Sequence, residues 1–126
     1  MSQRTPLGRV RGLGSAKGGT EHFWMQRVTA VANIVLVSFL IWLVLTLAGA
    51  DHATVKRTLA RPEIAIPLLL LVLSGVVHMR LGMQTIIEDY VHSEGRKVAA
   101  LMLNSFFAIL IGVTCAFAVL KLSFGA

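Results

Sequence analysis

Three long blocks of this sequence contain no charged side chain, and they constrain the fold more than any other feature. The residues without Asp, Glu, Lys or Arg are 28–50, 64–79 and 98–120. A helix needs roughly 20 apolar residues to cross the hydrocarbon core of a bilayer. Lipid offers no partners to unpaired backbone groups, so a helix is the spanning structure expected for segments of this length.

The blocks therefore predict an all-α membrane protein with three transmembrane helices. We expect these helices at about residues 27–49, 63–90 and 98–121, because apolar character resumes after Arg80 and continues to Ile87. Little sequence remains for a soluble domain. The predicted organisation is a basic N-terminal segment, 1–26, followed by a three-helix transmembrane anchor, 27–126.

Basic residues are divided unequally between the two sides of the predicted membrane. Residues 1–27 and the loop after the second helix together carry seven Lys and Arg, whereas the 51–61 loop and the C-terminal end carry four. Cytoplasmic loops are enriched in such residues, so the N-terminus is predicted to be cytoplasmic and the C-terminus periplasmic. Orientation explains this positive charge, and no nucleic-acid partner is expected.

His78 lies deep in the second apolar block, where an ionisable side chain is expensive unless a specific group receives it. At about 100° per residue, Ser74, Gly75 and Gly82 lie within about 60° of His78 around the helix. A face with so little bulk would let a flat macrocycle approach the helix closely. It is equally typical of a tight helix–helix seam that contains one polar residue, so the residues alone leave both interpretations open.

Histidine is an axial ligand of haem iron, and a low-spin electron-transfer haem takes two axial ligands. The other three histidines, His22, His52 and His92, are all predicted at membrane edges. If His78 binds haem, the second ligand must come from another chain. Arg80 is about 200° further around the helix and cannot share this face, so it either snorkels toward an interface or pairs with a partner chain.

Asp89 and Tyr90 close the second predicted helix at the cytoplasmic boundary. A tyrosine hydroxyl beside a carboxylate there could donate to a quinone carbonyl and help to deliver protons. An ordinary interfacial tyrosine with an exposed acid is the alternative. Arg27 begins the first helix, at a level expected to match Tyr90, and could pair with a lipid phosphate or a haem propionate.

Two motifs carry a resemblance to a known family: H-x-R-x-G-x-Q-x-x-x-x-D-Y over residues 78–90 and H-F-W-x-Q-R-V-T-A over residues 22–30. With the three-helix layout, they resemble the small hydrophobic membrane anchor of succinate dehydrogenase (respiratory complex II), in a form similar to that of alphaproteobacteria. The resemblance implies that His78 ligates haem b and that the cytochrome b556 subunit supplies the other ligand. It also implies that Arg27 lies near the haem propionates, and that Tyr90 and Asp89 belong to the ubiquinone site.

The same resemblance implies a multi-pass protein of the bacterial inner membrane that anchors the flavoprotein and iron–sulfur subunits. The chain would be a non-dehydrogenating subunit of the enzyme, with no catalytic residue of its own, because succinate oxidation belongs to other chains. The alternatives are an anchor of quinol:fumarate reductase and a haem-free accessory subunit of a membrane complex. A small homo-oligomeric transporter, with His78 and Arg80 along a polar path, is a further alternative.

Overall fold

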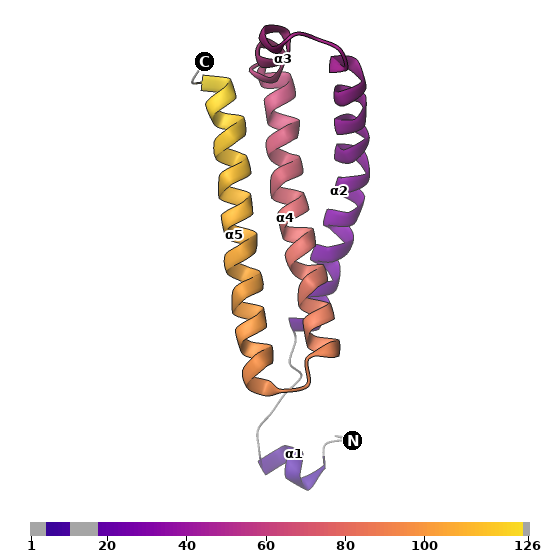
Figure 1. The fold of residues 1–126 in the computed structure, drawn as a ribbon. Coiled ribbons are helices and arrows are strands. Elements are labelled where there is room, and N and C mark those ends of the chain that lie inside the picture. The colour runs from indigo at the N-terminus through magenta and orange to yellow at the C-terminus, as the bar shows by residue number, and fades with distance from the viewer. Residues whose placement is uncertain (1–4, 11–17, 125–126) are drawn as a thin grey trace.

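The structure is a computed structural model that describes residues 5–10 and 18–124 of the 126-residue chain. Within these residues the regular elements are all helices: α1 (Pro6–Val10), α2 (Gly18–Leu47), α3 (His52–Leu59), α4 (Pro62–Tyr90) and α5 (Glu94–Phe124). Part of the predicted basic segment, 1–26, lies outside the described residues. The long helices α2, α4 and α5 run side by side and alternate in direction, so α2 begins at the end of the bundle where α4 finishes (Figure 1).

Three helices are long and apolar enough to cross a membrane, namely Gly19–Leu47, Pro62–Tyr90 and Glu94–Phe124. They confirm the predicted fold class. The second predicted helix, 63–90, agrees with α4 to within one residue. The other two are longer than predicted, since α2 already begins at Gly18 and α5 extends beyond 98–121 at both ends.

The extra length arises because a charge-free block marks only the part of a helix that lipid surrounds. The helix itself continues through polar residues as long as its backbone hydrogen bonds are not interrupted. Glu21 and Glu94 lie in the first turns of α2 and α5, where a negative side chain complements the helix dipole. Spans of 29 to 31 residues are about 45 Å long, which exceeds a hydrocarbon core of about 30 Å.

A short helix, α3, occupies the segment that the sequence analysis treated as the 51–61 loop. Gly49 has a φ of 82° just after α2, a conformation that glycine adopts readily. Asp51 then caps α3, and its carboxylate accepts hydrogen bonds from the Thr54 hydroxyl and from the backbone N–H groups of Ala53 and Thr54, at 3.2 and 3.4 Å. These bonds, with the Thr54 hydroxyl first, lower the pKa of Asp51 below its ordinary value.

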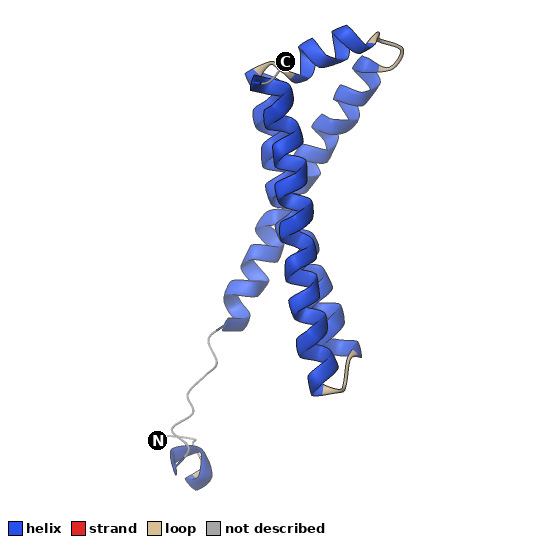
Figure 2. Cartoon of the chain, turned by 60° about the vertical axis from the view of Figure 1, so that its left-hand side comes forward, coloured by secondary structure: helices blue, strands red, loops and turns tan. Residues whose placement is uncertain are grey.

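Helix α4 is the central element of the bundle. It packs along both α2 and α5, and α3 contacts the neighbouring ends of α4 and α5. The view in Figure 2 shows α2 crossing the α4–α5 pair obliquely. The α4–α5 seam depends on small side chains: Ala108 is only 1% exposed, and a Cβ added at Gly112 would lie 3.5 Å from Val76.

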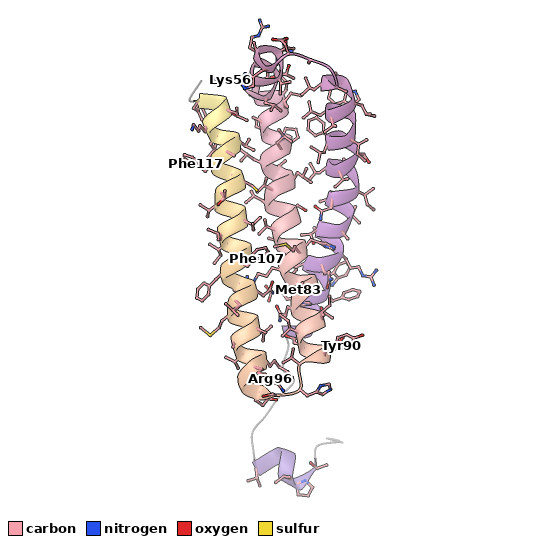
Figure 3. The ribbon with its side chains drawn as sticks, in the orientation of Figure 1. Lys56, Met83, Tyr90, Arg96, Phe107 and Phe117 are labelled. Carbon is pink, nitrogen blue, oxygen red and sulfur yellow. The ribbon has the colours of Figure 1, made fainter. Side chains whose placement is uncertain are left out.

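Most large apolar side chains of the long helices point away from these seams (Figure 3). Among the described residues no large side chain is completely buried, and Val31, Ile34, Leu45, Phe106 and Phe117 are examples of large apolar residues that remain exposed. A surface patch of this extent would be unstable in water. The three helices therefore require lipid, or other apolar helices, around them.

Candidate functional site

His78 lies where α2 crosses α4, and its ring contacts a polar residue of α2. The Nδ1 atom is 3.1 Å from Oγ1 of Thr29. Thr29 is only 7% exposed. On the same face of α4, the Ser74 hydroxyl donates to the backbone carbonyl of Thr29 over 3.4 Å. Two polar contacts to one residue thus fix α2 against α4 at the level of His78.

An open pocket of about 340 Å³ lies beside this contact. It is lined by Phe23, Gln26, Arg27, Ala30 and His78. The Arg27 guanidinium carbon lies 5.0 Å from the centroid of the Phe23 ring, within the range of a cation–π interaction. The tertiary structure therefore brings Arg27 and His78, from two different helices, to the same pocket.

This position corrects the depth expected for Arg27. Arg27 was expected at the level of Tyr90, but Gln26 lies beside Gly82, with its Nε2 3.8 Å from the position of an added Cβ. Gly82 precedes Tyr90 by eight residues, or about 12 Å along the helix. The prediction was wrong because it assumed a helix that begins at Arg27, whereas α2 begins at Gly18, nine residues earlier. Arg27 belongs with His78 and not with Tyr90.

The face of α4 on either side of His78 is open enough for a planar group. A Cβ added at Gly75 would meet no atom within 4 Å, and one at Gly82 would meet only the end of the flexible Gln26 side chain. These glycines are one turn before and one turn after His78. The helix–helix seam that was the alternative interpretation is present as well, but it uses Ser74 and Thr29 and leaves the glycines uncovered. The residues therefore fit a flat group with a metal at its centre.

Tyr90 ends α4 and is 77% exposed. It lines a second open pocket of about 320 Å³ together with Val91, His92, Arg96 and Ala100. Figure 3 shows Tyr90 and Arg96 at the same end of the bundle, on either side of the short α4–α5 connection. Asp89 is exposed but does not line this pocket, and neither does Arg27.

His92 and Arg96 are pocket residues that the sequence analysis did not assign to a site. The feature of the sequence that could have identified them is the short connection between α4 and α5, since only three residues separate Tyr90 from Glu94. A connection this short reverses the direction of the chain and places the first turn of α5 beside the last turn of α4. A cationic side chain beside Tyr90 was therefore to be expected from spacing.

Arg80 points away from the His78 face, as predicted, and is exposed. Its backbone carbonyl accepts a hydrogen bond of 3.0 Å from the Asn104 side-chain amide. Asn104 is buried and belongs to α5, so this bond joins α4 to α5. Such polar contacts between membrane helices contribute about 0.6 kcal/mol on average. Asn104 is thus a structural residue that the sequence analysis missed.

Two buried polar atoms on α2 have no hydrogen-bond partner among the described residues. They are Nε2 of His22 and Oδ1 of Asn33. A buried polar atom without a partner carries a desolvation cost of about 1–3 kcal/mol. Both atoms lie on α2, the helix that borders the His78 pocket.

Comparison with known proteins identifies the family of this chain. The model of the family described as "Succinate dehydrogenase/Fumarate reductase transmembrane subunit" matches residues 1–113. This chain belongs to that family. No solved structure matches it.

Curated relatives within this family carry a more specific name. A "Succinate dehydrogenase hydrophobic membrane anchor subunit" of Paracoccus denitrificans is 32% identical over 100% of this chain and 97% of its own length. The protein of the same name in Rickettsia bellii is 32% identical over 85% of this chain and 86% of its own. A "Succinate dehydrogenase membrane anchor subunit" of Reclinomonas americana is 32% identical over 74% of this chain and 80% of its own. The family resemblance inferred from the two motifs is thereby confirmed, and the chain is a transmembrane subunit of an oxidoreductase complex.

Proposed function

We propose that this chain is the membrane anchor of a succinate:ubiquinone oxidoreductase, and that His78 is one axial ligand of a haem b shared with a cytochrome b556 subunit. One observation carries the proposal. His78 and Arg27 line the same open pocket, and among the described residues the His78 ring is hydrogen-bonded only through Nδ1. Nε2 is then available to a metal ion.

The bound haem would supply a one-electron relay within the membrane. The residues of this chain hold and surround it. His78 presents Nε2 from the middle of α4, Gly75 and Gly82 leave its neighbourhood free of side-chain bulk, and Arg27 offers a cation to an anionic propionate. Among the described residues no second histidine lines this pocket, so a second ligand would come from the partner subunit.

Tyr90 is proposed as the hydrogen-bond donor to a ubiquinone carbonyl. Its side chain is exposed beside His92 and Arg96 in the pocket at the end of α4. A cationic side chain there favours electron density on the quinone oxygens, and water can reach the site to deliver protons. Asp89, the preceding residue, contributes negative charge and proton-accepting capacity at the rim of this pocket rather than within it.

This end of the bundle is proposed to be cytoplasmic, because α5 carries Arg96 and Lys97 at this end, and because α2 begins at this end and is preceded by a sequence rich in Lys and Arg. The flavoprotein and iron–sulfur subunits would then dock next to Tyr90, on the face of the bacterial inner membrane where electrons from succinate arrive. The relatives named above are subunits of succinate dehydrogenase. They favour this direction of catalysis over quinol:fumarate reduction, which the same family includes.

The test is the reduced-minus-oxidised absorbance spectrum of the complex captured through a tagged chain in mild detergent. The wild-type complex should contain the three partner subunits and show a low-spin b-type spectrum. His78→Ala should remove or perturb this spectrum, whereas His52→Ala, at the far end of the bundle, should not. A complex of the expected subunits that shows no b-type absorbance, or an unchanged spectrum and midpoint potential in His78→Ala, would refute the haem assignment.

A further inference from the structure

Thr29 is the hydrogen-bond partner of His78, and its own hydroxyl is already committed elsewhere. Oγ1 of Thr29 lies 2.8 Å from the carbonyl oxygen of Met25 and 3.2 Å from that of Gln26. It also lies 3.1 Å from Nδ1 of His78. A hydroxyl has one hydrogen to donate and two lone pairs with which to accept. The three neighbours cannot all be acceptors at once.

The backbone carbonyls have no hydrogen to give, so they can only accept from Thr29. A threonine within a helix commonly donates to the carbonyl one turn earlier, and the Met25 contact is the shortest of the three. With the hydrogen of Thr29 used in this way, Oγ1 can only accept from His78. Nδ1 of His78 then carries the hydrogen, and the lone pair of the neutral ring is on Nε2.

We infer that Thr29 is a positioning residue for His78: it holds the ring as the Nδ1–H tautomer and fixes its orientation, so that Nε2 is directed to the haem iron. This inference rests on the proposed function. A hydrogen bond from the second ring nitrogen of a ligating histidine orients the ring and raises the basicity of the ligand. If the tautomer were reversed, Nε2 would carry the hydrogen and could not bind the metal.

The surroundings suit this role. Thr29 is nearly buried, so water does not compete for the hydrogen bond. Its backbone is held by the Ser74 hydroxyl from the same face of α4. The distance between Thr29 and His78 is therefore set by the crossing of two helices and not by a mobile side chain.

The experiment compares three substitutions in the assembled complex by redox titration of the haem absorbance. Thr29→Val keeps the shape of the side chain and removes the hydroxyl, whereas Thr29→Ser keeps the hydroxyl. Thr46→Val is the matched control, because Thr46 donates to the carbonyl of Trp42 over 2.8 Å in the same helix, is exposed, and makes no hydrogen bond to a histidine among the described residues.

Thr29→Val should shift the haem midpoint potential to a more positive value, since a less basic ligand stabilises the oxidised iron less, and should alter the ferric low-spin spectrum. Thr29→Ser and Thr46→Val should match the wild type. An unchanged potential and spectrum in Thr29→Val would overturn the inference, and so would a shift in Thr29→Ser as large as that in Thr29→Val. If Thr29→Val does not assemble, Thr29→Ala removes the hydroxyl without adding bulk and takes its place: a positive shift supports the role of the hydroxyl, and an unchanged potential refutes it.

The same titration separates this inference from the proposed function. A wild-type complex without a b-type spectrum overturns both. A wild-type spectrum that Thr29→Val leaves unchanged overturns only the role of Thr29, and the His78 assignment stands on its own variant.

Discussion

Replacing Tyr90 with phenylalanine removes one hydroxyl and leaves the rest of the molecule as it is. The side chain is 77% exposed, and its hydroxyl has no hydrogen-bond partner among the described residues. Surface substitutions of this kind change stability by no more than about 0.5 kcal/mol. A larger effect on quinone reduction, with artificial-acceptor activity unchanged, is therefore the effect expected from a lost contact with the quinone.

The size of that effect follows from a single hydrogen bond. A bond of this kind contributes about 0.5–1.5 kcal/mol, and since 1.4 kcal/mol is tenfold in affinity, its loss corresponds to about a 2- to 12-fold rise in the KM for ubiquinone. If the hydroxyl interacts more strongly in the transition state, kcat should fall as well. Succinate oxidation by an artificial acceptor that takes electrons before the membrane subunits should stay at the wild-type rate.

The assay measures succinate–ubiquinone reductase activity and artificial-acceptor activity on the same detergent-solubilised complex. Glu88→Gln is a suitable control, because Glu88 is exposed two residues before Tyr90, bonds only to Gln84 over 2.8 Å among the described residues, and does not line the Tyr90 pocket. Unchanged kcat and KM for ubiquinone in Tyr90→Phe would refute the assignment. Equal losses with both acceptors would indicate a damaged complex rather than a lost contact.

Three further predictions concern the anchor itself. Ala108→Leu should overpack the α4–α5 seam and cost about 1–3 kcal/mol, lowering the Tm of the complex in detergent, whereas Ile109→Leu on the exposed face should have no such effect; an unchanged Tm for Ala108→Leu would contradict the packing described above. Because the pKa of Asp51 is lowered in the folded chain, its cap should be intact above the ordinary carboxylate range and should be lost as the pH falls through this lowered pKa. Amide-exchange protection at the start of α3 should decrease over the same pH range. Asp51→Ala should abolish this pH dependence. In a chain without its own cysteine, Thr58→Cys should react with an impermeant reagent from the periplasmic side and Ser93→Cys only from the cytoplasmic side; labelling of both from one side would disprove the topology.

The class of structure and the centre of each membrane helix can be read from the amino-acid sequence alone. Charge-free blocks of sufficient length leave a helix as the only spanning solution, because lipid cannot satisfy backbone groups. The start of α4 at Pro62 was equally readable, since proline at the first helical position loses no hydrogen bond. The cap of α3 was readable too, from Asp51 and Thr54, although the segment was taken for a loop. Each of these features can be recognised from the residues of one segment, without reference to the rest of the fold.

Which residues of α2 contact which residues of α4 depends on how the two helices pack in three dimensions. An apolar helix can pack against its neighbour at many angles and registers with similar contact, and nothing in the α2 sequence selects one of them. The observed packing places Thr29 against His78 and brings Arg27 to the same pocket as His78. Threonines that donate to their own helix occur elsewhere in α2 and α4. Thr29 differs from these threonines because it faces His78 across the α2–α4 contact. The packing of the two helices determines this pairing, and neither helix's sequence determines it alone.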